Sequence, residues 1–500
     1  ECEFAGKHNV TGLVLFERYS SYSDTMTGYK KGYFSNNPVD ISMGMENQSP
    51  FVSGSHNNRG MASFVGKLGY AYAKKYMVEA TLRADGSYKF APQNRWGYFP
   101  SVSGGWTLSN EKFMSGVKDK IGLTFLKLRA SWGRNGNISV LSGYPYATTI
   151  SVGNNWYQYH VDEKGSVSSS SPSGIPNPNL TWETSEQIDL GLDARFLSNR
   201  LTLGIDFFDK RTRDLLFSKP VPPELGVSSV TVNGGEVLNQ GLEFELGWKD
   251  SIGDFSYGIN ANLSTLKNEV LSLPEGTSKV TRTDASSTNY PVQTIFEAGY
   301  PVWYIRGYKY MGVDASGEPT YLKADGTVDT KVDSGDMVML GQGTPKLTFG
   351  LNINLAWKGL DFQLFGSGIS GNVIMPVLYR TGFKNHMKYE MDNYKNGTYP
   401  EPSKTRGKFQ FWSSSANIFK GDYFRIKQLQ LGYTLPQSLT KKALISNLRF
   451  YVSLDDYFTI TRYPGADPET ASYNSGDARG MDSGSYPTTK KAVFGINLTF

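Results

Sequence analysis

Hydrophobic and polar residues alternate strictly over many short segments of this chain. In residues 347–357 the odd positions are Leu, Phe, Leu, Ile, Leu and Trp, whereas the even positions are Thr, Gly, Asn, Asn and Ala. Residues 126–133 and 255–263 show the same period of two. Because successive side chains of a β-strand point to opposite faces, each segment predicts a strand with one apolar and one polar face.

The predicted strands come in pairs joined by tight turns. The pairs are residues 64–72 with 76–84, 188–196 with 201–208, 242–248 with 255–263, and 347–357 with 360–366. Further strands are predicted at residues 11–18, 99–108, 126–133, 429–435, 448–455 and 492–500, which gives about fourteen in all. Far longer stretches separate the pairs, at residues 134–187, 209–241, 264–346, 367–424 and 456–491.

This alternation of tight turns and long loops predicts an all-β protein, a transmembrane antiparallel β-barrel. Loops of such length count against a compact soluble domain, but an outer-membrane barrel has short turns on one side and long loops on the other. Strands of nine to eleven residues suit a tilted membrane crossing. Aromatic residues also cluster at strand ends, as in interface girdles: Trp132, Trp248, Trp357 and Tyr433. A β-sandwich, whose strands alternate as well, is the alternative.

Composition is consistent with a barrel and excludes several other classes. Charged residues make up 19% of the chain, below the usual quarter, and no run approaches eighteen apolar residues, which excludes a transmembrane helix. The net charge of +5 is small for 500 residues, so nucleic acid is not an expected partner. Cys2 is the only cysteine, which excludes a disulfide within the chain. Residues 1–4 resemble neither a signal peptide nor a start at Met, so we expect residues 1–500 to be part of a longer precursor and of one barrel domain.

Motifs for enzymatic chemistry are absent from the sequence. The four histidines lie in or beside predicted loops, and neither a G-x-S-x-G nor an H-E-x-x-H motif occurs. We therefore expect no enzyme, no catalytic residue and no cofactor. The acidic segment around Asp325 and Gly326 could be a calcium loop, but it lacks EF-hand spacing. A hairpin tip with Asp-Gly turn chemistry is favoured, and no metal is expected.

Three groups of residues are candidates for function. Charged residues on the polar strand faces could contact an internal plug or a substrate: Glu79, Arg83, Lys127, Arg129, Asp189, Asp193, Arg195, Glu243 and Glu245. Loop aromatics could stack on a ligand or pack the loops together: Trp156, Tyr157, Tyr159, Trp303, Tyr304 and Trp412. The last strand ends on an alternating apolar face that could serve as an assembly signal as well as face lipid: Phe494, Ile496, Leu498 and Phe500.

Several ordered segments resemble one known family. They are YMVEATLRADGSYKF (76–90), RWGYFPS (95–101), WTLSNEKF (106–113), LKLRASWGRNG (126–136), NPNLTWETSEQIDLGLD (177–193), NQGLEFEL (239–246), YFRIKQLQLGYTLP (423–436), YPGADPE (463–469) and the terminal strand. Together they are similar to the C-terminal half of SusC-like TonB-dependent transporters of Bacteroidetes.

The resemblance implies a fold, a location and a set of partners. It implies a 22-stranded outer-membrane barrel, of which this chain would supply about fourteen strands and the remaining N-terminal part the first strands and the plug. It also implies a SusD-like surface lipoprotein as a lid, and energy from the TonB–ExbB–ExbD complex through the absent plug portion. Outer-membrane lipid would surround the barrel. The implied function is active import of a large nutrient, an oligosaccharide or a peptide.

Two other functions stay open on the sequence alone. A passive outer-membrane porin would need no plug, so the residues upstream of Glu1 would decide between porin and importer. A soluble surface glycan-binding or glycan-cleaving β-protein would be released without detergent. If it cleaved glycans it would need a pair of carboxylates in one cleft.

Overall fold

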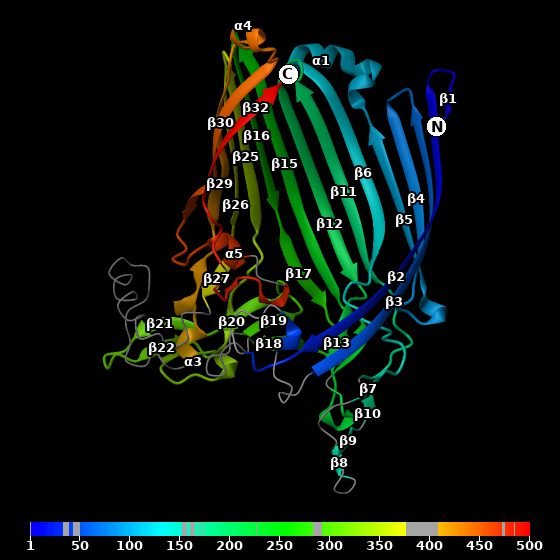
Figure 1. Cartoon of the computed structure of the whole chain (residues 1–500), viewed down its shortest axis with the longest axis vertical. Helices are drawn as coiled ribbons and strands as arrows, with labels where there is room; N and C mark the ends of the chain where they lie inside the picture. The colour runs from blue at the N-terminus through cyan, green and yellow to red at the C-terminus, as the bar shows by residue number, and fades with distance from the viewer. Residues whose placement is uncertain are drawn as a thin grey trace.

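The computed structural model describes residues 2–33, 40–43, 51–152, 158–160, 166–168, 170–172, 174–227, 229–283, 293–376, 409–472, 476–484 and 486–500. One large antiparallel sheet dominates this part of the chain (Figure 1). Its fourteen long strands are β2 (His8–Tyr29), β3 (Phe51–Tyr72), β4 (Tyr76–Ser87), β5 (Trp96–Trp106), β6 (Leu123–Asn137), β11 (Glu183–Phe196), β12 (Leu201–Arg213), β15 (Glu236–Ile252), β16 (Phe255–Thr265), β25 (Leu347–Trp357), β26 (Leu360–Ser370), β29 (Tyr423–Thr434), β30 (Asn447–Thr461) and β32 (Lys491–Thr499). All fourteen strands predicted from the alternation are confirmed.

Two strands are much longer than the alternation predicts. β2 and β3 pair over 22 residues each, from His8 opposite Tyr72 to Tyr29 opposite Phe51, whereas the predicted strands end at residue 18 and begin at residue 64. Residues 19–29 are largely polar on both faces, so backbone pairing continues where the hydrophobic period stops. The connection that was predicted between β15 and β16, over residues 249–254, is also too long, because backbone pairing again continues beyond the alternating residues. β15 and β16 extend to Ile252 and Phe255, which leaves a turn of Gly253 and Asp254.

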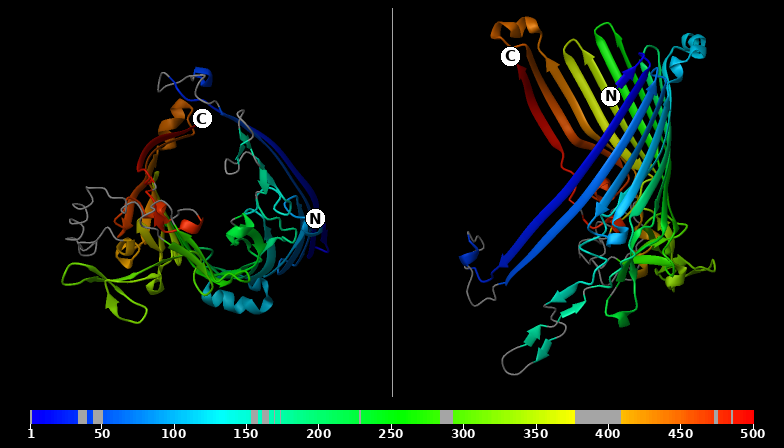
Figure 2. Two further views of the ribbon diagram at one scale, coloured as in Figure 1. Left: turned by 90° about the horizontal axis from the view of Figure 1, so that it is seen from below. Right: turned by 90° about the vertical axis from the view of Figure 1, so that its right-hand side faces the viewer.

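The sheet curves into an incomplete ring with two open edges (Figure 2). Strands follow one another in chain order from β1 (Cys2–Phe4) to β32, and β1 pairs with only His8 to Val10 of β2. In the described residues, β32 pairs on one side only, with β30. Short connections lie at one end of the sheet, here named the turn end, together with the C-terminus. The long connections lie at the opposite end, the loop end (Figure 1).

The two faces of the sheet differ in chemistry, as the alternation predicts. One face exposes large apolar side chains and is here named the apolar face: Val78, Leu82, Val102, Leu128, Leu190, Leu246, Ile259, Leu431, Phe450, Phe494 and Ile496. The other, the polar face, carries the residues between them. A soluble sheet would cover such an apolar face, whereas a membrane barrel presents it to lipid.

The long connections carry small sheets of their own, of which the sequence predicted only the hairpin tip around Asp325. The strands are β7 (Ile150–Val152) with β10 (Ser170–Pro172), β8 (Gln158–His160) with β9 (Ser166–Ser168), β13 (Leu216–Pro220) with β14 (Ser229–Asn233), and β17 (Lys267–Ser272) on β15. Further strands are β18 (Lys279–Thr283), β19 (Gln293–Glu297), β20 (Tyr304–Gly307) and β24 (Val338–Gly341) in one sheet, β21 (Lys309–Val313), β22 (Pro319–Leu322) and β23 (Val328–Asp329) in another, and β27 (Val373–Pro376), β28 (Phe419–Lys420) and β31 (Met481–Asp482) in a third. These strands are short, and several are buried on both sides. They therefore lack the period that reveals a strand in sequence.

The α-helices are short and lie in the connections. They are α1 (Ser115–Ile121) and α4 (Gln437–Thr440) at the turn end, and α3 (Phe409–Trp412) and α5 (Pro468–Ser472) at the loop end (Figure 1). In the described part of the chain, no helix is both long enough and apolar enough to cross a membrane.

Glu111, in the turn-end connection before α1, accepts three hydrogen bonds. The donors are the Tyr76 hydroxyl at 2.6 Å, Lys75 Nζ at 3.0 Å and Trp106 Nε1 at 3.2 Å. These bonds, with the largest effect from Tyr76, lower the pKa of Glu111 to about 2. The carboxylate therefore joins the turn ends of β4 and β5 to the connection that follows.

This lowered pKa predicts an acid-sensitive contact. The folded state holds Glu111 ionised below its ordinary pKa of about 4.3, so the stabilisation is complete above that value and is lost as the pH falls toward about 2. We expect the unfolding midpoint of the wild type to fall more steeply with acidification than that of Glu111→Gln, measured on detergent-solubilised protein. Parallel pH profiles of the two proteins would contradict this prediction.

Candidate functional site at the polar face and the loop end

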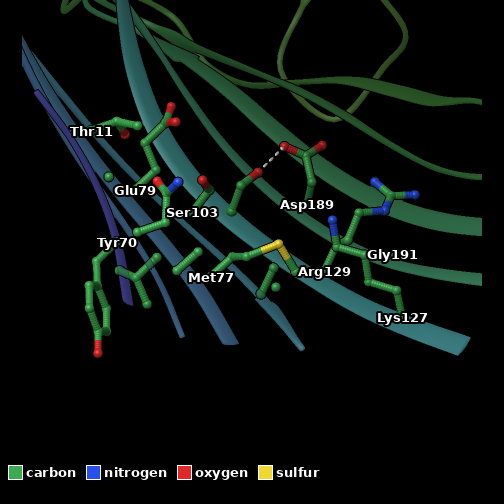
Figure 3. A pocket seen from close by; sticks show the side chains of 17 residues that line it. Thr11, Tyr70, Met77, Glu79, Ser103, Lys127, Arg129, Asp189 and Gly191 are labelled. Atoms are coloured by element: carbon green, nitrogen blue, oxygen red, sulfur yellow. Dashed lines mark hydrogen bonds between the residues drawn. The ribbon is translucent and has the colours of Figure 1, made fainter. Parts of the chain in front are cut away.

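A recess in the polar face spans β2 to β11 and lies close to the turn ends of β2, β3, β4 and β5 (Figure 3). Its volume is about 430 Å³, and small residues line part of it: Gly69, Gly104, Gly105 and Gly191. Charged side chains surround these glycines: Glu79, Lys127, Arg129 and Asp189. Because glycine leaves room for another chain to approach the wall, the recess can receive a polar segment that bears charges of both signs.

Ion pairs across neighbouring strands organise the charges of this wall. Arg129 on β6 donates to Asp193 on β11 through Nε at 2.8 Å and also to Asp206 on β12 through Nη2 at 3.0 Å. Lys67 pairs with Glu79 at 2.7 Å. These side chains are only partly buried, so they retain surface on which a further polar group could bind.

The structure places all nine charged residues that were predicted for the polar strand faces on the polar face of the sheet, opposite the exposed apolar side chains. Arg83 binds Asp85 at 2.8 Å, Asp189 accepts from Ser131 at 3.0 Å, and Glu243 accepts from Ser264 at 3.1 Å. A second recess of about 670 Å³ brings together four others of the set: Lys127, Asp193, Arg195 and Glu245. Contact of these residues with a plug or a substrate stays a prediction.

The loop aromatics that the structure describes pack within the loops. Tyr304 is 3% exposed and donates its hydroxyl to Glu297 at 2.6 Å, which gives its ring a packing role. Burial, together with Glu297, raises the pKa of Tyr304 far above its usual value. Trp303 contacts Phe296, and Trp412 packs edge-on against Phe411. Trp156, Tyr157 and the side chain of Tyr159 lie outside the described residues. Ligand contact by Trp303 or Trp412 stays a prediction.

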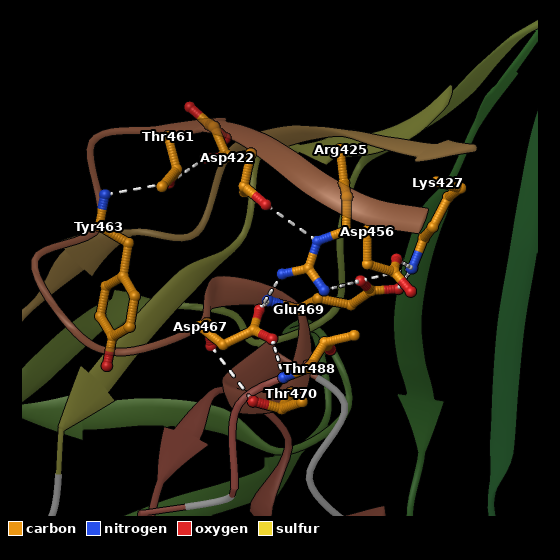
Figure 4. A network of polar contacts seen from close by, with 11 residues as sticks. Asp422, Arg425, Lys427, Asp456, Thr461, Tyr463, Asp467, Glu469, Thr470 and Thr488 are labelled. Carbon is orange, nitrogen blue, oxygen red and sulfur yellow. Dashed lines mark hydrogen bonds and ion pairs between the residues drawn. The ribbon is translucent and has the colours of Figure 1, made fainter. Parts of the chain in front are cut away.

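A buried charge cluster at the loop end was not singled out by sequence reasoning (Figure 4). Arg425, at the loop end of β29, forms an ion pair with Asp467 and a second one with Glu469 at 2.9 Å. The Arg425 and Asp467 side chains are 4% and 2% exposed. Lys427 binds Glu469 at 2.7 Å and Asp456 at 3.4 Å. The cluster fastens the last long connection to the wall of the sheet.

Asp467 remains ionised in this cluster despite its burial. Burial acts to raise its pKa, but hydrogen bonds from the Thr488 and Glu469 backbone N–H groups and from Arg425 outweigh it, so the pKa is lowered. The two sequence segments that carry these residues, 423–436 and 463–469, are thus joined in space.

The described parts of three long connections, here named the loop assembly, meet at the loop end: residues 266–283 with 293–346, residues 371–376 with 409–422, and residues 462–472 with 476–484 and 486–490. Gly343 lies against the backbone of Arg479 and Gly480, so closely that a Cβ on Gly343 would lie 2.1 Å from the Arg479 carbonyl oxygen. β27 pairs with β31 beside this contact. One apolar cluster includes members from all three connections: Ile305, Met375, Ala478 and Met481. The connections therefore form one packed body.

The acidic segment forms a hairpin tip, as predicted. β22 and β23 pair through Leu322 and Val328, and the Asp325 carboxylate accepts from the Thr327 backbone N–H at 2.9 Å. Asp333 and Asp336 cap a neighbouring single turn of helix. Among the described residues, His, Cys, Asp and Glu side chains form no group of three or more that could hold a metal ion.

The terminal strand presents the predicted apolar face. Phe494, Ile496, Leu498 and Phe500 are 78%, 64%, 46% and 82% exposed. On the opposite face, the Tyr451 ring covers Gly495, where a Cβ would lie 2.2 Å from the ring. An aromatic ring over a strand glycine stabilises an edge pairing.

Replacing Phe500 by serine tests whether the terminal strand is also an assembly signal. Because the Phe500 side chain is 82% exposed, its loss removes little packing, and the folded barrel should keep its unfolding midpoint. We expect the amount of membrane-inserted protein to fall severalfold, measured as the heat-modifiable band on gels. Tyr486→Ser, at an 81% exposed loop position, is the matched control. If both variants insert equally well, Phe500 contacts lipid but is not part of an assembly signal.

Comparison with known proteins places these features in a family. A profile described as "TonB dependent receptor-like, beta-barrel" matches residues 4–455. "TonB-dependent receptor P3" of Formosa agariphila is 32% identical over 89% of this chain and 46% of its own length. "TonB-dependent receptor SusC" of Bacteroides thetaiotaomicron is 28% identical over 88% of this chain and 44% of its own length.

Solved structures agree with the sequence matches. The structure described as that of the RagAB peptide transporter superposes with a TM-score of 0.83 and 26% identity, over 99% of this chain and 53% of that chain. The same importer in an open-open state gives a TM-score of 0.83 at 25% identity, over the same shares of the two chains. The chain thus spans about half the length of the relatives that it matches.

Proposed function

Because the chain belongs to the family of TonB-dependent receptor-like β-barrels, we propose that it forms the C-terminal barrel portion of an outer-membrane importer. The importer would take up a large nutrient, a peptide or an oligosaccharide, and the chain carries out no covalent chemistry. The remaining N-terminal part would supply the missing strands and a plug. TonB–ExbB–ExbD would supply energy through that plug, and a SusD-like lipoprotein would cover the loop end.

The observation that carries this proposal is the curved sheet itself, which has an exposed apolar face suited to lipid, a charged polar face and two open edges. Open edges of this length expose unpaired N–H and C=O groups, which lipid cannot satisfy, so further strands must complete the ring. The charged wall and its recesses are suited to hold a polar plug inside that ring. The likeness to a solved peptide transporter at 26% identity favours peptide as the cargo class.

The packed loop assembly supports a lidded importer rather than an open pore. Its three connections pack into one body at the loop end, which gives a partner a preformed surface. A passive porin would need neither a plug nor a lid. Membership of the family of TonB-dependent receptor-like β-barrels supports the importer over a passive porin and over a soluble glycan-binding protein.

Isolation of the native complex tests the proposal. The protein would be extracted from cells in mild detergent through a tag on this chain, and everything that copurifies would be identified by mass spectrometry. We expect the plug-bearing N-terminal part, a SusD-like lipoprotein and bound peptide or glycan. Uptake of the identified cargo should be lost in cells that lack TonB.

Three outcomes would contradict the proposal. A barrel without a plug that conducts ions steadily in planar bilayers would be a porin. Recovery of the chain in the aqueous fraction without detergent would contradict the membrane barrel. Cargo uptake that does not depend on TonB would contradict active import.

A further inference from the structure

The connections at the turn end are strongly basic. They comprise residues 5–7, 73–75, 107–122, 197–200, 253–254, 358–359 and 435–446. They hold ten basic residues, namely Lys7, Lys74, Lys75, Lys112, Lys118, Lys120, Arg200, Lys358, Lys441 and Lys442, but only three acidic ones, Glu111, Asp119 and Asp254. The whole chain has 51 basic and 46 acidic residues, so the rest has 41 and 43. The positive charge of the chain is therefore concentrated at one end of the barrel.

The longest of these connections carries an exposed apolar face next to its lysines. A single helical turn, Lys112–Met114, leads directly into α1. Phe113, Val117 and Ile121 are spaced four residues apart, which places them on one side of this helical stretch. They are 64%, 43% and 53% exposed. Both views of Figure 2 place α1 outside the curve of the sheet rather than within the ring.

Contacts hold the start of this helical stretch beside two aromatic side chains at the turn ends of β4 and β5. Glu111, just before it, accepts hydrogen bonds from Tyr76 and Trp106. These two rings stack 6.2 Å apart at the turn ends of β4 and β5. Their exposed surfaces continue the apolar face of the sheet, so the apolar side of α1 extends a surface that already faces lipid.

A second turn-end connection, residues 435–446, also combines exposed apolar side chains with lysines. Leu439 in α4 and Leu444 just beyond it are 64% and 84% exposed. Lys441 and Lys442 lie between them in sequence. Within the described part of the chain, these two lysines, Lys112 and Lys120 form no ion pair, so their charges are available to an external anion.

We propose that the turn end is a docking surface for an anionic phospholipid leaflet, with Glu111–Ile121 as its main contact. The apolar side of α1 lies at the boundary between headgroups and acyl chains, and Lys112 and Lys120 bind lipid phosphates. An interfacial helix with these features binds through buried apolar area together with attraction to anionic lipid. The surface fixes the depth of the barrel and recruits anionic lipid to one side of it.

Photo-crosslinking in defined bilayers tests this proposal. The full-length protein, with a benzophenone amino acid at Phe113 or Val117, is placed in nanodiscs of phosphatidylethanolamine with a minority of phosphatidylglycerol. We expect lipid adducts at both positions, enriched in phosphatidylglycerol relative to the bilayer. Asp119, about half a turn away on the opposite side of α1, is the matched control position and should give severalfold fewer adducts. In Lys112→Gln and Lys120→Gln, the enrichment should fall up to about fivefold for each lysine replaced.

Three results would overturn the proposal. The first is equal lipid labelling at Phe113 and Asp119, which would remove the apolar contact. The second is an adduct composition that equals the bulk bilayer and does not change in the lysine variants, which would remove the recruitment of anionic lipid. The third is crosslinking of Phe113 in native membranes mainly to another protein, which would assign the surface to a protein partner. Heat-modifiable gel mobility establishes that each variant is a folded barrel.

Discussion

Arg425→Met is expected to release the last long connection from the wall of the barrel. The substitution leaves the buried Asp467 carboxylate without its cation, and breaking a buried ion pair in this way costs about 3–5 kcal/mol. If the local stability falls by this much, amide exchange in residues 463–472 should become at least about a hundredfold faster, because opening of the connection no longer has to break the cluster. Hydrogen exchange followed by mass spectrometry on the assembled protein measures this change.

Two variants separate the buried cluster from charge loss in general. Lys358→Met removes one partner of an exposed pair with Asp254, at 3.6 Å and more than 60% exposed on both sides, and should change stability by less than about 1 kcal/mol. Asp467→Asn in the Arg425→Met background should recover part of the loss, because it removes the uncompensated negative charge. Unchanged exchange in Arg425→Met would mean that the cluster does not fasten the connection.

Gly343→Ala is expected to separate the connections of the loop assembly while the barrel stays intact. The new Cβ would lie 2.1 Å from the Arg479 carbonyl oxygen and 2.7 Å from Gly480 N, and both contacts are with backbone that cannot move aside cheaply. Overpacking of this kind costs up to about 3 kcal/mol. We expect faster proteolysis at the loop end, with membrane insertion unchanged, and cargo import reduced by about an order of magnitude if the assembly carries the lid.

Gly174→Ala is the matched control for this substitution. Among the described residues other than the chain neighbours, no atom lies within 4 Å of the position that a Cβ on Gly174 would occupy, so the same chemical change has room in another long connection. Proteolysis and import should equal those of the wild type in the control. Normal proteolysis of Gly343→Ala would contradict the proposed packing, whereas fast proteolysis with normal import would contradict only its role in lid binding.

The sequence was sufficient to predict the wall of the barrel because its two faces meet different surroundings. The strand at residues 347–357 was predicted with the bounds that β25 has, since lipid on one side requires Leu, Phe or Ile at every second position. The far part of β2 was not predicted. Beyond residue 18 its two faces are both largely polar, and pairing with β3 leaves no period in the side chains.

The loop end could not be predicted in the same way. β20 has four residues and is mostly buried on both faces, so no alternation marks it, and Tyr304 within it looked like an exposed loop aromatic. The cluster around Arg425 was hidden for another reason. Its acidic partner lies 42 residues further along the chain, and a pattern of local spacing cannot indicate a contact at that distance. The polar-face charges were found because they alternate with lipid-facing residues, but alternation does not say what binds them.

The order of strands in the sheet has a consequence for how the barrel forms. Each long strand from β2 to β30 pairs with the next long strand along the chain, and the pairs that are joined at the turn end are close in sequence, so registry can propagate within each of these hairpins. Such local pairing has a low entropic cost and favours fast folding. The strand pairs that are joined at the loop end, such as β16 with β25, bring together residues much further apart in sequence, and in the proposed complete barrel the seam between β32 and the N-terminal part would span the greatest distance of all. Ring closure, rather than strand formation, should therefore be the slow kinetic step, and the step at which assembly factors have most to accelerate.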